Sequence, residues 1–166
     1  MDLTELTNTS LLGIYLNDHL AGATAGVSLI ERTAQAQQGT SAGPSLAKLA
    51  TEIAEDRESL LEIMSVLDVG IARYKLAGAW VAERAGRLKL NGRLLSRSPL
   101  SSLVEVEGMK LGVEGKAALW RSLRALAEDD SRLDISRLDA LLARAKAQSR
   151  TLERLRVAAA AEALAP

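Results

Sequence analysis

Apolar residues recur every three or four positions along this chain, which is the period of an amphipathic α-helix. The first such stripe predicts a helix over residues 10–37, with Thr9 or Ser10 as its N-cap. Its apolar positions are Leu12, Leu16, Leu20, Ala23, Val27 and Ile30. Residues 37–44 contain glutamine, glycine and proline, and they predict the loop that ends this helix.

The same period predicts two more helices in the first half of the chain. One covers residues 45–67 and ends at a tight turn that begins at Asp68. The other covers residues 71–90, where alanine and glycine replace many of the large side chains. Such small side chains let neighbouring backbones approach on more than one side, so we expect this helix in the middle of the fold.

A fourth helix is predicted over residues 99–127. It begins at Pro99, because proline fits the first turn of a helix, where its missing N–H costs nothing. Three glycines are expected to kink this helix or to divide it in two: Gly108, Gly112 and Gly115.

A last stripe of apolar residues predicts a helix over residues 134–164. Its N-cap is Asp134, or Ser136 together with Asp139. Short connections between successive helices favour antiparallel neighbours. The pattern therefore predicts one all-α domain over residues 1–166, an up-down antiparallel bundle of four to five helices.

Composition favours helices over sheets. The chain holds 30 Leu and 28 Ala but only two Trp, two Tyr and no Phe, which is typical of closely packed helices. It has no cysteine, which excludes thiol chemistry and iron–sulfur clusters. The first residues are acidic where a signal peptide is basic, and no apolar run approaches the ~20 residues that span a bilayer. We expect a soluble, cytoplasmic protein, and the excess of Arg over Lys favours a GC-rich bacterial source.

The net charge of zero hides an asymmetry along the chain. Residues 1–70 carry ten acids and three cations, whereas residues 73–97 carry seven cations and only Glu83. The candidates for anion binding in this basic stretch are Arg84, Arg87, Lys89, Arg93 and Arg97. No aromatic stacking residues accompany them, so self-association, pairing with the acidic helices or an acidic protein partner is favoured over nucleic acid.

Several polar residues fall on apolar helix faces and are candidate functional residues. His19, the single histidine, lies near the centre of the first helix's apolar face, whereas Asp18 points more than a quarter turn away. The others are Asp56, Arg57, Glu107, Gln148 and Arg156. Because an inward-facing charge is costly unless it is paired, we expect a buried network in which Arg57 pairs with Glu107 or Asp56. His19 should hydrogen-bond nearby. The alternative is a ligand or metal site inside the fold.

Two stretches, Tyr15-Leu-Asn-Asp-His-Leu-Ala-Gly and the acidic Glu52-Ile-Ala-Glu-Asp-Arg-Glu, resemble the ferritin-like superfamily. The likeness extends to uncharacterised ferritin-like proteins of GC-rich bacteria through Gly86-Arg-Leu-Lys-Leu-Asn-Gly-Arg, Ser98-Pro-Leu-Ser and Gly115-Lys-Ala-Ala-Leu-Trp.

The di-iron members of that superfamily use a Glu from two helices and a Glu-x-x-His from each of the other two. This chain has no Glu-x-x-His. The resemblance therefore implies the fold without the standard di-iron site. What remains is a reduced site for iron or manganese, built from His19, Asp56 and Glu107.

These observations predict a non-enzymatic protein that acts through self-association or a protein partner, with the inward polar residues as a structural network. A homodimer is expected to form through the helix over residues 71–90, where Trp80 lies on a second, partly apolar stripe. No cofactor and no nucleic-acid or membrane partner is expected. The competing interpretation is a metal-binding protein or oxidoreductase with a degenerate carboxylate and histidine site.

Overall fold

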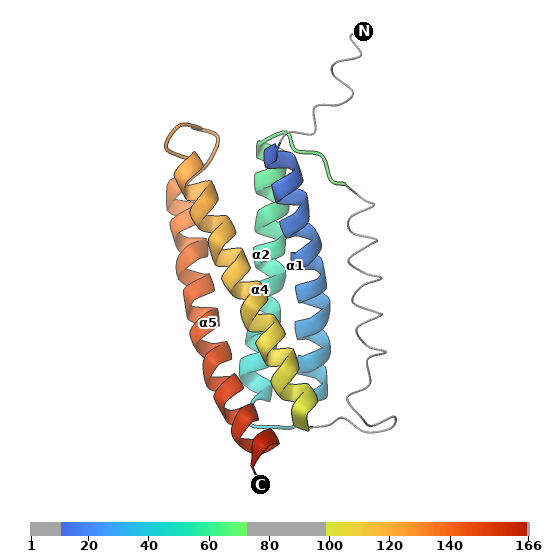
Figure 1. Ribbon diagram of the computed structural model, residues 1–166. Helices are drawn as coiled ribbons and strands as arrows, with labels where there is room; N and C mark the ends of the chain where they lie inside the picture. Colours follow the sequence, from blue (N-terminus) through green and yellow to red (C-terminus); the bar gives the residue numbers. More distant parts are fainter. Residues whose placement is uncertain (1–10, 73–98, 166) are drawn as a thin grey trace.

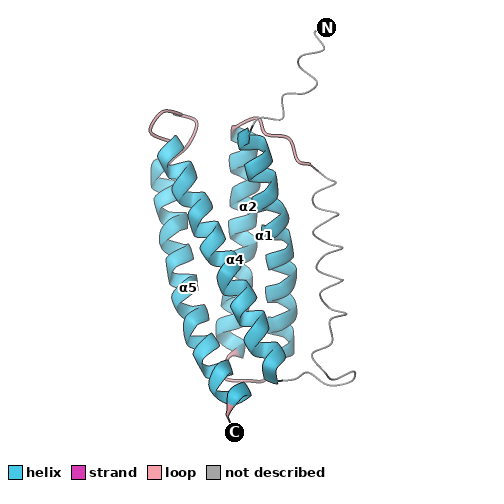
Figure 2. Cartoon of the chain, viewed as in Figure 1, coloured by secondary structure: helices cyan, strands magenta, loops and turns pink. Residues whose placement is uncertain are grey.

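The computed structural model describes residues 11–72 and 99–165 (Figure 1). These residues form four α-helices and no strand, as Figure 2 shows. The helices are α1 (Leu11–Ala36), α2 (Gly43–Val66), α4 (Pro99–Leu126) and α5 (Ile135–Leu164). The predicted all-α class is confirmed for this part of the chain, and each of these helices begins and ends within two residues of its predicted bounds.

Part of the sequence-based account lies outside the described residues. Of the helix predicted over residues 71–90, only residues 71–72 are described, and they are not helical. Trp80 and the five anion-binding candidates fall in the remainder: Arg84, Arg87, Lys89, Arg93 and Arg97. The dimer contact and the anion site predicted there stay predictions.

The four helices form two hairpins whose neighbours run antiparallel. α1 contacts α2 and α4, and α5 contacts α4 and α2 (Figure 1). The Tyr15 hydroxyl donates to Ser122 Oγ at one end of the α1–α4 contact, and Gln37 Nε2 donates to Ser102 Oγ at the other. Leucines dominate the core between the hairpins, together with the fully buried Trp120.

The expectation that glycines divide the fourth helix is wrong, because α4 is one continuous helix. Its inner face is held in the core by Val106, Met109, Val113 and Leu123. A Cβ built on Gly112 would meet nothing within 4 Å. Burial of the inner face therefore outweighs the low helix propensity of the glycines, which is the usual balance for helices in folded proteins.

The helix ends follow the local chemistry of the sequence. Asp134 is the N-cap of α5, and its side chain accepts a hydrogen bond from the backbone N–H of Arg137. At the end of α2, Asp68 has a positive φ of 57°. The Val69 N–H donates to the Met64 carbonyl at 2.9 Å, the pattern of a Schellman motif. Both the cap at Asp134 and the turn beginning at Asp68 are confirmed.

Candidate functional site

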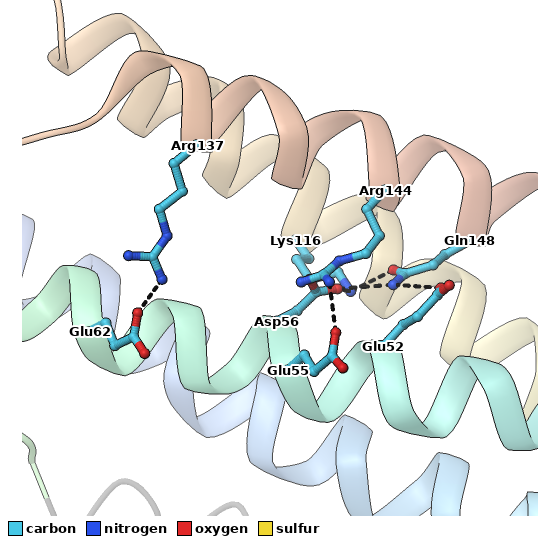
Figure 3. A network of polar contacts seen from close by, with 8 residues as sticks. All are labelled: Glu52, Glu55, Asp56, Glu62, Lys116, Arg137, Arg144 and Gln148. Atoms are coloured by element: carbon cyan, nitrogen blue, oxygen red, sulfur yellow. Dashed lines mark hydrogen bonds and ion pairs between the residues drawn. The ribbon is translucent and has the colours of Figure 1, made fainter.

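A buried polar cluster joins α2, α4 and α5, and its centre is Asp56. The Asp56 side chain is 0% exposed. One of its oxygens, Oδ2, accepts hydrogen bonds from Lys116 Nζ and, at 3.0 Å, from Gln148 Nε2. The other, Oδ1, accepts from Arg144 Nε at 2.7 Å. Figure 3 shows these side chains converging on Asp56 from the two neighbouring helices. Both carboxylate oxygens are thus fully engaged.

Two further acids complete this group, which we call the Asp56 cluster: Glu52, Glu55, Asp56, Lys116, Arg144 and Gln148. Arg144 Nη1 donates to Glu55 Oε2 at 2.8 Å. The Gln148 amide donates to Glu52 Oε2 at 3.3 Å and accepts from Lys116 Nζ at 2.7 Å. Lys48 lies 3.6 Å from Glu52. With that lysine included, three carboxylates face three cations, so the group is electrically balanced.

Lys116 is a largely buried base in the cluster. Its side chain is only 12% exposed. Burial lowers the pKa of the Lys116 ammonium, and the nearby Asp56 carboxylate opposes that shift. The amine nitrogen donates to both Asp56 and Gln148. The arrangement therefore holds Lys116 as a hydrogen-bond donor that links α4 to α2 and α5, which is a structural role.

The predicted pairing of Arg57 with Glu107 or Asp56 is wrong. Arg57 Nε donates instead to Thr24 Oγ1 of α1 at 3.1 Å, and its Nη1 donates to Glu58 Oε1 at 2.6 Å. The physical reason is the helical period, because one residue along a helix turns the side chain by about 100°. Asp56 faces α5, and Arg57 therefore faces α1.

Glu107 and Arg156 also lie outside the core, contrary to the prediction. Glu107 is exposed, and Arg156 Nη1 lies 3.8 Å from its carboxylate. Arg156 also binds Glu153 through two hydrogen bonds of 3.0 and 2.8 Å. The neighbouring Val106 takes the buried position on α4. These charges form a surface network between α4 and α5.

His19 is only partly buried and is not a partner of Asp56. Its ring packs edge-on against Tyr15, with ring centroids 4.6 Å apart. Burial lowers the pKa of His19, and the charge of Asp18 opposes this. Among the described residues, no three His, Cys, Asp or Glu side chains form a group that could hold a metal ion. His19, Asp56 and Glu107 are all described, so the predicted metal site is not assembled.

Of the six predicted polar residues, the structure brings Asp56 and Gln148 together in the buried cluster and Glu107 and Arg156 together at the surface. Sequence reasoning missed Lys116 and Arg144, which supply the positive charge. Arg144 precedes Gln148 by four residues and so shares its helix face. That spacing was the available signal for Arg144, whereas nothing local pairs Lys116 with an acid 60 residues away.

A second missed residue is Asn17, which is buried on α1. Its Nδ2 donates to the carbonyls of Gly13 and Gly70 at 2.9 Å each. Its Oδ1 accepts from the Ala72 N–H at 2.7 Å. Asn17 therefore fixes the chain that follows α2 against α1.

Several large aliphatic side chains are exposed on the hairpin of α4 and α5. We call this set the aliphatic face: Leu100, Val104, Leu111, Val157 and Leu164. The contact of Lys110 with Glu153, at 3.7 Å, sets the register of the two helices. It places the first half of α4 beside the second half of α5, so all five side chains belong to the same half of the hairpin.

Comparison with known proteins found no matching family model, no matching curated protein and no matching solved structure. None of the described helices combines the length and the hydrophobicity needed to cross a membrane. The side chains themselves are therefore the basis for a functional proposal.

Proposed function

We propose that this chain is a non-enzymatic helical-bundle protein of ferritin-like type that acts by self-association. The observation that carries the proposal is the aliphatic face. Its side chains are exposed by 42% to 74%. Its members fall on one stripe of each helix, at four- and seven-residue spacings. Exposed apolar side chains bordered by polar residues are typical of protein–protein contacts. Four long helices in two antiparallel hairpins, together with the sequence resemblance, support the ferritin-like type.

Charges of both signs border the aliphatic face and favour a second copy as its occupant. Lys110 and Arg156 lie among Glu107, Glu114 and Glu153, each within 4.0 Å of an opposite charge. A surface that carries both signs can meet a rotated copy of itself without net repulsion. Twofold contacts between identical surfaces are the commonest arrangement of soluble oligomers.

The Asp56 cluster has a structural role in this proposal. The side chains at its centre already have partners inside the cluster: Asp56, Lys116, Arg144 and Gln148. A ligand would therefore have to displace an existing hydrogen bond. The alternative is a metal-binding protein or oxidoreductase. No group of metal-ligating side chains among the described residues supports it. Elemental analysis of untagged protein and of His19→Ala tests that alternative directly, because a stoichiometric metal lost with His19 would favour it.

Sedimentation velocity over a range of protein concentrations tests the proposal. We expect the wild-type chain to dimerise, and Val104→Asp to abolish the dimer because it buries an unpaired carboxylate at the contact. Val66→Asp is the matched control. Val66 on α2 is 48% exposed and Val104 is 49% exposed, but Val66 lies outside the aliphatic face. A wild-type chain that stays monomeric at high concentration, or equal effects of the two variants, would contradict the proposal.

A further inference from the structure

A row of exposed cations on the outer side of α5 has no counter-charge among the residues that the structure describes. Nearly every other cation of the described residues has an opposite charge or another polar partner nearby. Lys146, Arg150 and Arg154 have no carboxylate within 4.0 Å among the described residues, and the one hydrogen bond in the row joins Arg154 to Thr151. We call these three residues the basic row. Arg121 on α4 also has no carboxylate within 4.0 Å among the described residues, but it is not part of a row.

The basic row lies along one face of α5. Its members are spaced four residues apart, which places them about one helical turn from each other. All three are exposed, while Leu141, Ala145 and Leu152 of the same helix are buried. Because another side of α5 packs in the core, the basic row faces solvent. Like charges at this spacing repel one another by a few tenths of a kcal/mol per pair, and carboxylates of a bound partner would relieve that repulsion.

Several exposed alanines lie close to the basic row on α5. Ala143 and Ala147 are exposed beside Lys146 and Arg150, and Ala158 and Ala161 are exposed beyond Arg154. Alanine leaves the helix backbone open to close approach, and small residues at a helix surface favour contact with another helix. Long cationic side chains beside such a strip can reach the carboxylates of a bound helix.

The described residues of a second copy do not offer a matching acidic row. Their acids without a cation partner are Glu31, Asp129, Asp134 and Glu162, and these lie on α1, on the turn after α4, at the N-cap of α5 and on α5. The glutamates of α2 are engaged with Arg57, Arg137 and Arg144. A basic stripe along a helix is also a feature of nucleic-acid binding, but domains of that kind are strongly basic as a whole, with a pI above about 9, whereas this chain has a net charge of zero.

We propose that the basic row docks an acidic α-helical segment of a different protein, with carboxylates repeated at four-residue spacing. The proposal does not rest on the proposed self-association, although Val157 of the aliphatic face lies one helical turn from Arg154 on the same side of α5. The helix would lie along α5 on the alanine strip, and its carboxylates would pair with Lys146, Arg150 and Arg154. The basic row thus selects the partner by the spacing of its negative charges as well as by their sign.

Fluorescence anisotropy with a labelled synthetic peptide tests this docking. The probe is an alanine- and leucine-containing helix with Glu at every fourth position, and the reference is a peptide of the same composition with its Glu residues clustered at one end. Wild-type protein should bind the probe more tightly than the reference. The double variant R150E/R154E should weaken binding by about tenfold or more, since exposed ion pairs contribute ~0.2–1 kcal/mol each and reversal replaces attraction with repulsion.

Arg121→Glu is the control because it reverses one exposed cation away from the basic row, and it should leave binding unchanged. Far-ultraviolet circular dichroism should show that each variant keeps its helices. Equal affinity for the two peptides, equal effects of Arg121→Glu and R150E/R154E, or tighter binding of duplex DNA than of the probe would overturn the proposal. Val104→Asp separates the two proposals, because it should remove the dimer and leave peptide binding intact.

Discussion

The buried charges of this protein and the exposed cations on the outer side of α5 differ in the partners that the fold gives them. Inside, the Asp56 carboxylate meets two cations and an amide, and all of its oxygens are used. Among the buried side-chain nitrogens and oxygens of the described residues, only Trp120 Nε1 lacks a hydrogen-bond partner. Outside, Lys146, Arg150 and Arg154 stand in a row, and residues 11–72 and 99–165 place no carboxylate within 4.0 Å of them.

This difference separates stability from recognition. A buried charge without a partner costs several kcal/mol, so the folded chain must supply its partners internally. An exposed cation is solvated by water and costs little when it is left alone. Exposed charges can therefore pair with another molecule, whereas buried charges already pair within the fold.

The largest effect is expected for Asp56→Ala. It leaves Lys116 and Arg144 facing a buried site without their carboxylate, so the free energy of unfolding should fall by about 3–5 kcal/mol. Urea unfolding followed by circular dichroism measures this loss. Glu55→Gln is the control, because the exposed contact of Glu55 with Arg144 should contribute less than about 1 kcal/mol. Similar losses for the two variants would mean that Asp56 is not the centre of the cluster.

A second test compares an inner with an outer glycine. Gly43 is buried, and a Cβ built there would lie 2.8 Å from the backbone oxygens of Gln37 and Gln38. Gly43→Ala should therefore lower the free energy of unfolding by about 1–3 kcal/mol. Gly112→Ala meets no atom within 4 Å, and it should raise stability by about 0.5–1 kcal/mol through better helix propensity. The comparison fails if both substitutions change stability in the same direction.

The smallest effect is expected for His19, whose side chain is neither fully buried nor fully exposed. Burial lowers the pKa of His19 from its ordinary value of 6.5. The unfolded chain therefore takes up a proton at higher pH than the folded chain does, and stability should fall as pH decreases through 6.5 towards the lowered value. His19→Gln should remove this part of the pH dependence. Urea midpoints of both proteins at neutral and mildly acidic pH measure it, and identical slopes would contradict the account.

The hydrophobic period predicted the helices well because burial of one face decides where a helix forms and ends. Asp134 shows that local capping chemistry is equally readable, since a short acidic side chain at that position bonds to the first turn. Gly112 was misread because its flanking residues, not the glycine, determine whether α4 continues. Helix propensity is a local term, and packing outweighs it.

The candidate site was only partly predictable from sequence. Asp56 and Gln148 fall well inside the apolar stripes of α2 and α5, so their burial could be anticipated. Glu107 lies one position from Val106, and a shift of one residue turns a side chain by about 100°. The helical period alone does not show whether a residue at the edge of an apolar stripe is buried or exposed. Lys116 and Arg144 reach Asp56 from other helices, and no local pattern encodes which helices will be neighbours.

Side-by-side urea unfolding of the Lys146→Ala, Arg150→Ala, Arg154→Ala triple variant and of Asp56→Ala tests the central claim most directly. The claim predicts that the triple variant stays within about 0.5 kcal/mol of the wild type, as surface substitutions usually do, or gains slightly from relieved repulsion. Asp56→Ala should lose several times more. A triple variant destabilised as strongly as Asp56→Ala would contradict the claim, because the basic row would then belong to the fold and not to a binding surface.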